Sequence, residues 1–413
     1  KIMARHPELL IPASSLEVLK TAVVFGADAV YIGGEAFGLR AKAKNFSMED
    51  MKEGVKFAHV HGARVHVTVN ILAHNDDLEG AAEYLKELKE IGPDALIIAD
   101  PAIFMLAKEI CPEIERHVST QANNTNYGTF NFWWNLGAKR VVTARELSLK
   151  EIREIRAHIP AEMEIESFIH GAMCISYSGR CLLSNFFTGR DANQGACTHP
   201  CRWKYSVVEE TRPGEYMPVY ENERGTYIFN SKDLCMIEHI PEMIDAGIDS
   251  FKIEGRMKTA LYVATVARTY RKAIDDYLED PKKYEANMPW YRDQISNCTY
   301  RQFTTGFYFG KPGDESQIYD SNTYIKEYTY LGIIGGIKDG MYRIEQRNKF
   351  SVGETVEIMK PDGQNVEVTV EKIIDEDGQE QESAPHPKQV LYVALSGEAS
   401  VYDILRRQEG VTE

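Results

Sequence analysis

Four cysteines lie within 28 residues of this 413-residue chain, and four thiolates that converge on one point can hold an iron–sulfur cluster or a structural zinc ion. They are Cys174, Cys181, Cys197 and Cys201, and the chain has three other cysteines. Gly, Ser, Asn and Arg are frequent around them, which predicts an ordered loop and not a core strand or helix. The segment 172–205 is therefore a candidate metal-binding loop.

The spacing of these cysteines is compatible with either an iron–sulfur cluster or a zinc ion. Six residues separate the first pair, fifteen the middle pair and three the last pair. Zinc sites usually contain two short cysteine pairs, with about two to four residues inside each pair, and here only Cys197 and Cys201 form one. The irregular spacing favours a cluster held by a wrapped loop, with zinc as the alternative.

Other roles for the cysteines are weaker. Disulfides are disfavoured because the long chain has an odd number of cysteines and no signal-peptide pattern. A catalytic pair of His170 and Cys174 would leave three clustered thiols unexplained. We interpret Cys111 and Cys298 as packing residues, and Cys235 is an alternative fourth ligand.

The composition is that of a globular protein, with 43% hydrophobic and 26% charged residues. No apolar run approaches the roughly 18 residues that span a bilayer. We expect a cytoplasmic protein, because thiols stay reduced in the cytoplasm and clusters are built there. The net charge of −15 alone argues against a nucleic-acid partner, since phosphate contacts require Lys and Arg.

Local groups of basic residues oppose this overall charge. One group follows the second expected strand and the other lies in the cysteine segment. If the chain binds RNA, we expect these residues to contact it, and the alternative is an ordinary solvated surface. They are Arg40, Lys42, Lys44, Arg180, Arg190, Arg202 and Lys204.

The elements that must position these residues alternate between short apolar strands and amphipathic helices, which predicts a parallel sheet in an α/β fold. Helices are expected at 14–25, 47–61, 76–91 and 148–157, the first two with capped starts at Ser14 and Ser47. Eight strands over about 250 residues are typical of a (β/α)8 barrel. A doubly wound sheet is the alternative, although no Gly-x-Gly-x-x-Gly follows the first strand. The expected strands are 8–13, 29–34, 64–70, 95–100, 116–122, 140–144, 163–170 and 250–254.

In such a barrel, functional residues lie at the C-terminal ends of the strands. Polar side chains follow several expected strands, and the cysteine loop follows the seventh, so we predict one shared site at the barrel mouth. The alternative is that these side chains only cap helices. The residues are Asn70, Gln121, Asn123, Asn124, Arg145, Glu146, His170, Lys252, Glu254 and Arg256.

The C-terminal part has a different pattern. Residues 281–322 contain Pro281, Pro289 and Pro312 and little periodicity, and we interpret them as a connector after a barrel domain at 1–280. From 323 to 413, alternating strands with Gly turns predict a small antiparallel β-barrel, which could bind RNA, bind a partner or be an appendage. Its expected strands are 328–334, 341–345, 355–359, 366–374 and 390–395.

Several segments resemble the collagenase-like peptidase family U32, over nearly the whole chain. The most specific is Glu166-Ser-Phe-Ile-His-Gly-Ala-Met-Cys-Ile-Ser-Tyr-Ser-Gly-Arg-Cys. Others are Asp28-Ala-Val-Tyr-Ile-Gly-Gly, His117-Val-Ser-Thr-Gln-Ala, Ala144-Arg-Glu-Leu-Ser, Arg190-Asp-Ala-Asn-Gln-Gly-Ala-Cys-Thr-His-Pro-Cys and Lys252-Ile-Glu-Gly-Arg. The resemblance implies an iron–sulfur protein that takes part in oxygen-independent hydroxylation of tRNA, ribosomal RNA or a ubiquinone precursor.

Within that family the chain is most similar to the tRNA-modifying branch. This implies formation of 5-hydroxyuridine at the wobble position, with prephenate as the hydroxyl donor. It also implies a [4Fe–4S] cluster on Cys174, Cys181, Cys197 and Cys201, although some relatives draw the last ligand from further downstream, which keeps Cys235 open. A true peptidase, or a non-catalytic subunit paired with a second family member, remains the alternative. The sequence contains no Gly-x-Ser-x-Gly, His-Glu-x-x-His or phosphate-loop motif.

The implied chemistry gives roles to the residues at the strand ends. A dicarboxylate is best held by arginine forks, and we expect Arg145 and Arg256 to supply them. The expected substrate site also includes Lys252, Asn70 and Gln121, and Tyr177 could stack on a flipped base. Because uridine C5 must gain oxygen and lose a proton, proton carriers are needed, and we expect Glu166, His170 and Glu254.

Overall fold

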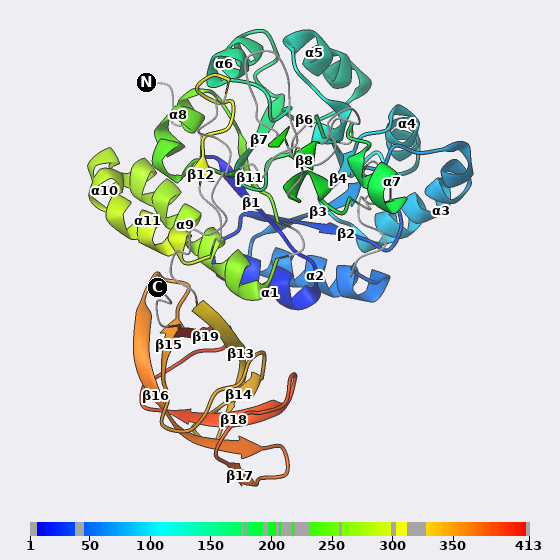
Figure 1. Cartoon of the computed structure of the whole chain (residues 1–413). Coiled ribbons are helices and arrows are strands. Elements are labelled where there is room, and N and C mark those ends of the chain that lie inside the picture. Colours follow the sequence, from blue (N-terminus) through cyan, green and yellow to red (C-terminus); the bar gives the residue numbers. More distant parts are fainter. Residues whose placement is uncertain are drawn as a thin grey trace.

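The structure is a computed structural model, shown in Figure 1, in which a large barrel domain stands above a smaller β domain. It describes residues 6–37, 45–174, 177–178, 180–190, 192, 197–203, 206–207, 217–218, 232–255, 258–298, 303–311 and 328–409.

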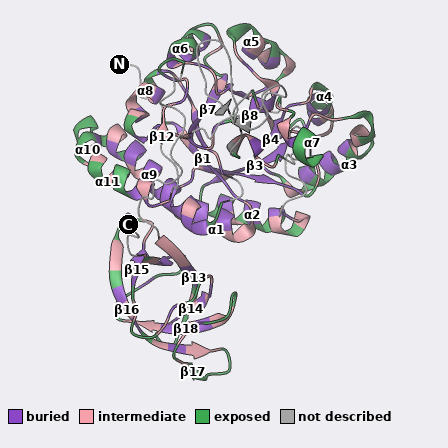
Figure 2. Ribbon diagram, viewed as in Figure 1, coloured by how far each residue is buried: buried purple, intermediate pink, exposed green. Residues whose placement is uncertain are grey.

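Eight parallel strands form a closed barrel, which confirms the predicted (β/α)8 fold. Their order is β11-β1-β2-β3-β4-β5-β6-β7, and β11 pairs back to β7 in parallel. Buried residues occupy the strands and the inner sides of the helices (Figure 2). The strands are β1 (Glu8–Pro12), β2 (Ala29–Gly33), β3 (Arg64–Val69), β4 (Ala95–Ile98), β5 (Glu115–Val118), β6 (Arg140–Val142), β7 (Glu164–Gly171) and β11 (Ser250–Ile253).

Helices surround the barrel, and capping side chains fix where several begin. Ser15 Oγ accepts a hydrogen bond from Val18 N at 3.3 Å, one residue after the Ser14 start that we expected, and Ser47 Oγ accepts from Asp50 N at 3.1 Å. None of the described helices is long and apolar enough to cross a bilayer. The helices are α1 (Leu16–Val24), α2 (Met48–Val60), α3 (Asn75–Ile91), α4 (Pro101–Ile110), α5 (Tyr127–Leu136), α6 (Leu149–Ala157), α8 (Ile240–Asp245) and α9 (Ala260–Glu279).

The stretch that we interpreted as a connector contains two short helices, α10 (Pro281–Ala286) and α11 (Met288–Ser296). Pro281 and Pro289 lie in the first turns of these helices, where the missing N–H costs nothing, so the prolines start helices here. Tyr284 and Tyr291 are buried against the barrel domain. Two strands, β10 (Asp233–Cys235) and β12 (Phe303–Thr304), extend the sheet outward from β7.

A network of buried and partly buried charges closes the N-terminal end of the barrel. Its members each occupy the first position of their strand: Glu8, Arg64, Glu115, Arg140 and Glu164. Arg140 is only 2% exposed, and its guanidinium donates to Glu8 at 2.6 Å and to Glu164 at 2.8 Å. Burial alone would raise the pKa of Glu8, but Arg140 outweighs it and holds that pKa well below its usual range. This end of the barrel is therefore held by ion pairs.

We expect Arg140→Met to lower the free energy of unfolding of the barrel domain by about 3–5 kcal/mol, because it leaves buried carboxylates without their cation. The measurement is urea unfolding followed by circular dichroism. Arg153→Met is the matched control, since Arg153 forms an exposed pair with Asp245 at 3.0 Å that contributes little. Equal losses in both variants would show that the buried network is not a main source of stability.

The C-terminal domain is an antiparallel β-barrel, as predicted. The strands run in the order β15-β19-β13-β14-β18-β16, β16 pairs back to β15, and β17 adds to β16. The sequence pattern missed β19, because Ile-Leu-Arg-Arg-Gln contains two charges. Arg406 in that strand is nevertheless buried, donating to Glu357 at 2.7 Å and lying 4.0 Å from the ring centre of Tyr328. The strands are β13 (Tyr328–Lys338), β14 (Met341–Glu345), β15 (Thr355–Met359), β16 (Asn365–Asp375), β17 (Glu380–Gln381), β18 (Val390–Leu395) and β19 (Ile404–Gln408).

The two domains are joined through α1 and α9. Arg268 on α9 donates to the carbonyl oxygen of Lys360 and to the Asn365 side chain, both at 2.9 Å. On the other side, Tyr330 Oη donates to Glu17 of α1 at 3.0 Å. These partly buried hydrogen bonds fix the small barrel against helices that lie away from the mouth of the large one.

Candidate active site at the barrel mouth

Arg145 and Glu254, two residues predicted at the mouth, lie against each other. Arg145 follows β6, Glu254 follows β11, and an Arg145 Nη donates to the Glu254 carboxylate at 3.2 Å. The other Nη of Arg145 donates to the carbonyl oxygen of Ala172 at 2.9 Å. Ala172 lies two residues before Cys174, so the guanidinium also anchors the start of the cysteine segment.

The charge of Arg145 is strongly stabilised. Burial lowers the pKa of its guanidinium, but the negative charges of Cys174 and Glu254 outweigh burial and raise it. The guanidinium carbon also lies 4.1 Å from the ring centre of Phe168, within the range of a cation–π contact. Arg145 is therefore a buried cation beside the first predicted cluster ligand.

Three buried polar atoms near the mouth have no hydrogen-bond partner among the described residues. They are Arg145 Nε, a donor, and two acceptors, Gln121 Oε1 and Asn123 Oδ1. An unpaired buried polar group costs free energy, so such atoms are typical of a place that receives a polar ligand. The site can thus bind a small molecule with both anionic and donor groups.

Gln121 connects the barrel to the cysteine segment. It lies in the short helix η1 (Thr120–Ala122) after β5, and its Nε2 donates to Ser178 Oγ at 2.6 Å. Asn70, at the end of β3, donates to Ser119 Oγ at 3.3 Å. Asn124 instead has a structural role, since it donates to backbone carbonyls and accepts from Trp133 Nε1 at 3.1 Å.

Lys252 and Glu166 lie deeper in the barrel, where they form an ion pair of 2.8 Å. Glu166 also accepts from Arg140 at 2.9 Å and is fully buried. Burial alone would raise the pKa of Glu166. The positive charges of Lys252 and Arg140 together lower this pKa by more than burial raises it, so the carboxylate stays ionised. Glu166 is the third residue of β7, well below the mouth, and this position does not support the predicted role as a proton carrier there.

His170 does not face the mouth either. In the pairing of β11 with β7, Lys252 lies opposite Phe168, but the next residue, Ile253, lies opposite His170. The strand β7 therefore has one extra residue at this point, a β-bulge, and the bulge turns the His170 side chain to the other face of the sheet. His170 Nδ1 lies 3.1 Å from Tyr270 Oη of the outer helix α9. Burial lowers its pKa to about 3, so the imidazole is neutral. This placement contradicts a role for His170 as a proton carrier at the mouth.

Cys235 belongs to the same outer cluster. It pairs with His170 across β10 and β7, and its Sγ lies 3.6 Å from Tyr270 Oη. Burial raises the pKa of this thiol to about 11, which disfavours the thiolate that a metal requires. The structure thus gives Cys235 a packing role, apart from the four clustered cysteines.

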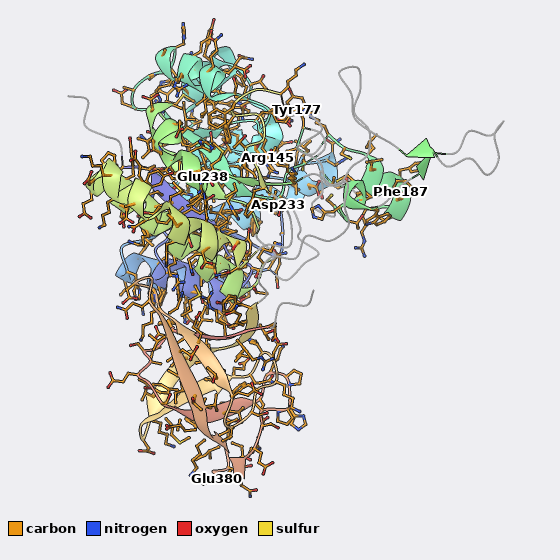
Figure 3. All side chains as sticks on the ribbon, turned by 60° about the vertical axis from the view of Figure 1, so that its left-hand side comes forward. Arg145, Tyr177, Phe187, Asp233, Glu238 and Glu380 are labelled. Carbon is orange, nitrogen blue, oxygen red and sulfur yellow. The ribbon has the colours of Figure 1, made fainter. Side chains whose placement is uncertain are left out.

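The cysteine segment projects from the mouth face of the barrel. Helix α7 (Leu183–Thr188) lies over the barrel in Figure 1, and in the turned view of Figure 3 the part with Phe187 stands out from the body. Hydrogen bonds join α7 to the stretch before the short helix η3 (Pro200–Arg202): Thr198 N donates to Ser184 Oγ at 3.0 Å. The predicted ligands Cys197 and Cys201 are thereby held beside α7.

None of the four clustered cysteines forms a disulfide. Cys174 and Cys197 are exposed, and Cys181 and Cys201 are half-buried. Within the described ranges, no three His, Cys, Asp or Glu side chains come together as a metal-binding group. The donor set itself fits an iron–sulfur cluster, because four cysteines that are exposed or half-buried lie in one segment.

Several predicted site residues lie outside the described residues. These are Arg40, Lys42, Lys44, Lys204 and Arg256, together with the side chain of Arg202. Arg180 and Arg190 are described, and both are exposed. Phe168, which supports Arg145, was missed, although its position two residues after Glu166 in β7 already predicts that it faces inward.

The closed barrel, with a largely buried arginine and a cysteine segment at its mouth, defines a (β/α)8 protein with a candidate ligand site at the strand ends. Family models agree with this architecture: peptidase family U32 matches residues 14–318, and the U32 C-terminal domain matches residues 326–406. The chain belongs to peptidase family U32.

Relatives of the chain carry names from RNA modification. It is 42% identical over 409 residues to tRNA hydroxylation protein P1 of Bacillus subtilis, covering 98% of this chain and 96% of the relative. It is 39% identical to tRNA hydroxylation protein P of Escherichia coli, covering 92% and 91%. It is 41% identical over 279 residues to a 23S rRNA 5-hydroxycytidine synthase of Escherichia coli, covering 68% of this chain and 41% of that protein.

Proposed function

We propose that this chain hydroxylates the wobble uridine of tRNA to 5-hydroxyuridine, with prephenate as the hydroxyl donor and without molecular oxygen. The observation that carries the proposal is the similarity, over both domains, to tRNA hydroxylation protein P1. The similarity to a 5-hydroxycytidine synthase supports the same reaction class, the addition of a hydroxyl group to a pyrimidine base. A cytoplasmic location, where tRNA is found, is part of the proposal.

The cofactor that we propose is a [4Fe–4S] cluster. Cys174, Cys181, Cys197 and Cys201 would hold it, and it would supply electron-transfer or Lewis-acid chemistry next to the barrel mouth. The hydrogen bond from Arg145 to the carbonyl oxygen of Ala172, two residues before Cys174, supports this location. A cation so close stabilises the thiolate form that ligates iron.

The chain's own residues would bind and orient the co-substrate. Arg145 offers an unpaired Nε and a charged guanidinium to a carboxylate of prephenate, and Arg256 is the second expected fork. Glu254, held by Arg145 and partly exposed, is the described carboxylate that remains suited to take the proton leaving uridine C5.

Peptidase activity is the alternative contained in the family name. A cysteine peptidase would require an imidazole beside its nucleophile, and His170 is the histidine nearest to Cys174 in sequence. His170 faces Tyr270 on the outer side of the barrel, which disfavours that pair. The other alternative is a non-catalytic subunit that requires a second family member.

The test is reconstitution with the single purified chain. Anaerobically prepared protein, loaded with iron and sulfide, is incubated with unmodified tRNA and prephenate, and nucleosides are analysed by mass spectrometry. We expect a uridine carrying one added oxygen atom, formed only with prephenate and equally in the absence of oxygen gas. No product from the loaded chain alone, but product after a second family member is added, would replace the single-chain proposal with an obligatory complex.

A further inference from the structure

Exposed apolar side chains are concentrated in the cysteine segment. Of the 13 large hydrophobic residues exposed in the described part of the chain, five lie between positions 177 and 203. Four of these five are aromatic, and Phe186 is 80% exposed. They are Tyr177, Leu182, Phe186, Phe187 and Trp203. Exposing this much apolar surface in one short segment is costly, and it usually marks a binding surface.

The rings on α7 and after η3 are held in a defined arrangement. The ring centres of Phe186 and Phe187 are 5.1 Å apart at 82°, and those of Phe187 and Trp203 are 6.0 Å apart at 50°. The hydrogen bond from Thr198 to Ser184 fixes the two chain segments that carry them. We call Phe186, Phe187 and Trp203 the aromatic platform. It offers preformed flat faces to a ligand.

The charge around the aromatic platform is positive, in contrast to the chain as a whole. Arg180 and Arg190 are both exposed, and they flank α7 in the sequence. Between positions 177 and 203 the sequence contains three arginines and one acid, Asp191, which gives a net charge of +2, whereas the whole chain has a net charge of −15. Exposed rings flanked by arginines complement a ligand that has both negative charges and flat rings, as RNA does. A lipid tail has neither of these features, and a protein surface with few acids lacks the negative charge.

We propose that the aromatic platform stacks on unpaired bases of an RNA loop, while Arg180 and Arg190 contact its phosphates. Proteins that bind single-stranded RNA combine these two elements, because every base has a face that can stack and every nucleotide carries a charge. This inference rests on the proposed function and adds to it: it identifies the surface that would hold the loop containing the target uridine. The platform lies on the mouth face of the barrel, on the segment joined to Gln121.

Two other uses of the same rings are alternatives. The rings could form an apolar shell around the proposed cluster, since Cys197 and Cys201 lie between α7 and Trp203 in sequence. They could also dock a second protein chain. Both alternatives depend on hydrophobicity alone, whereas stacking on bases requires an aromatic ring, and this difference can be tested.

The test measures binding without turnover, so it is independent of whether the chain hydroxylates uridine. Wild type and the variants Phe186→Ala, Phe186→Leu and Phe186→Tyr are titrated with an anticodon stem–loop RNA and with a fully paired RNA of equal charge. Phe132→Ala is the matched control, because Phe132 on α5 is 54% exposed and lies on an outer helix. Phe187→Ala repeats the test at a second ring.

Phe186→Ala and Phe186→Leu should each weaken stem–loop binding on the order of fivefold or more, and Phe186→Tyr should keep it. Binding of the paired RNA, and the slope of log affinity against log salt, should stay unchanged, since no phosphate contact is lost. Arg180→Ala should lower that slope.

The proposal fails if Phe186→Leu binds the stem–loop as wild type does, or if both RNAs weaken equally. It also fails if Phe186→Ala loses bound iron and sulfide, which would show a shell around the cluster, or if it changes only the oligomeric state. Hydroxylation with unaltered RNA affinity in all variants would overturn the platform and leave the proposed function standing. If the Phe186 variants lose affinity for the stem–loop but the wild-type chain does not hydroxylate uridine, the platform stands and the proposed function is wrong.

Discussion

Replacing Cys174 with serine is expected to abolish bound iron and inorganic sulfide and, with them, all uridine hydroxylation. A cluster with four thiolate ligands loses one of its attachments, and serine oxygen is a poor ligand for its iron. The same result is expected for Cys181→Ser, Cys197→Ser and Cys201→Ser. The measurements are the visible absorbance of anaerobically purified protein, iron and sulfide analysis, and nucleoside mass spectrometry.

Cys235→Ser is the matched control for these variants. Its thiol lies beside Tyr270 in the outer cluster, where a hydroxyl can keep the hydrogen bond, so iron content should stay at the wild-type level. A full cluster in Cys201→Ser together with loss in Cys235→Ser would show that our ligand set is wrong. Stoichiometric zinc without sulfide in wild type would show that the loop is a zinc site and that the cofactor is misassigned.

The barrel could be predicted from the sequence because its strands are buried on both faces and appear as short apolar runs between amphipathic helices. Some of the elements that escaped prediction bury charge or have proline in their first turn. The strand β19 was missed because Arg406 seemed too polar for a buried position, and its partners Glu357 and Tyr328 come from distant strands. Partners brought together only by the fold leave no local pattern in the chain.

The same reason explains which site residues could be found. Arg145 and Glu254 were predicted from their positions after strands, and the structure pairs them. His170 was also placed at the mouth because it ends the seventh expected strand, but one extra residue in β7 turned it toward Tyr270. A bulge is set by the pairing of β7 with β11 and not by residue type, so the sequence alone does not reveal it.

The charged network at the base of the barrel gives a second example. Glu8, Arg64 and Arg140 each begin a strand, where charged residues usually face solvent. Closing the barrel brings these ends to one axis and buries Arg140, while Glu8 and Arg64 stay partly exposed. Through Arg140 this couples Glu166 and Lys252 to the base and not to the mouth. Among the described residues, this leaves Arg145 as the buried cation that reaches the cysteine segment.

Arg145→Lys is therefore expected to impair hydroxylation even though the charge is kept. Lysine cannot donate to Ala172 and Glu254 in two directions while also offering a free donor to a carboxylate. Losing one arm of a charged clamp costs on the order of 1.5–3 kcal/mol, so KM for prephenate should rise about tenfold or more. Arg153→Lys on the outer helix α6 is the control and should behave as wild type.

Iron content decides what the loss of activity in Arg145→Lys means. If the variant keeps its cluster and only KM for prephenate rises, Arg145 binds the co-substrate, and adding Arg256→Lys should raise KM further. If iron and activity fall together, the contact with Ala172 serves to hold the cysteine segment, and Arg145 is a positioning residue for the cluster ligands. Normal tRNA modification in cells that carry both changes would exclude either role.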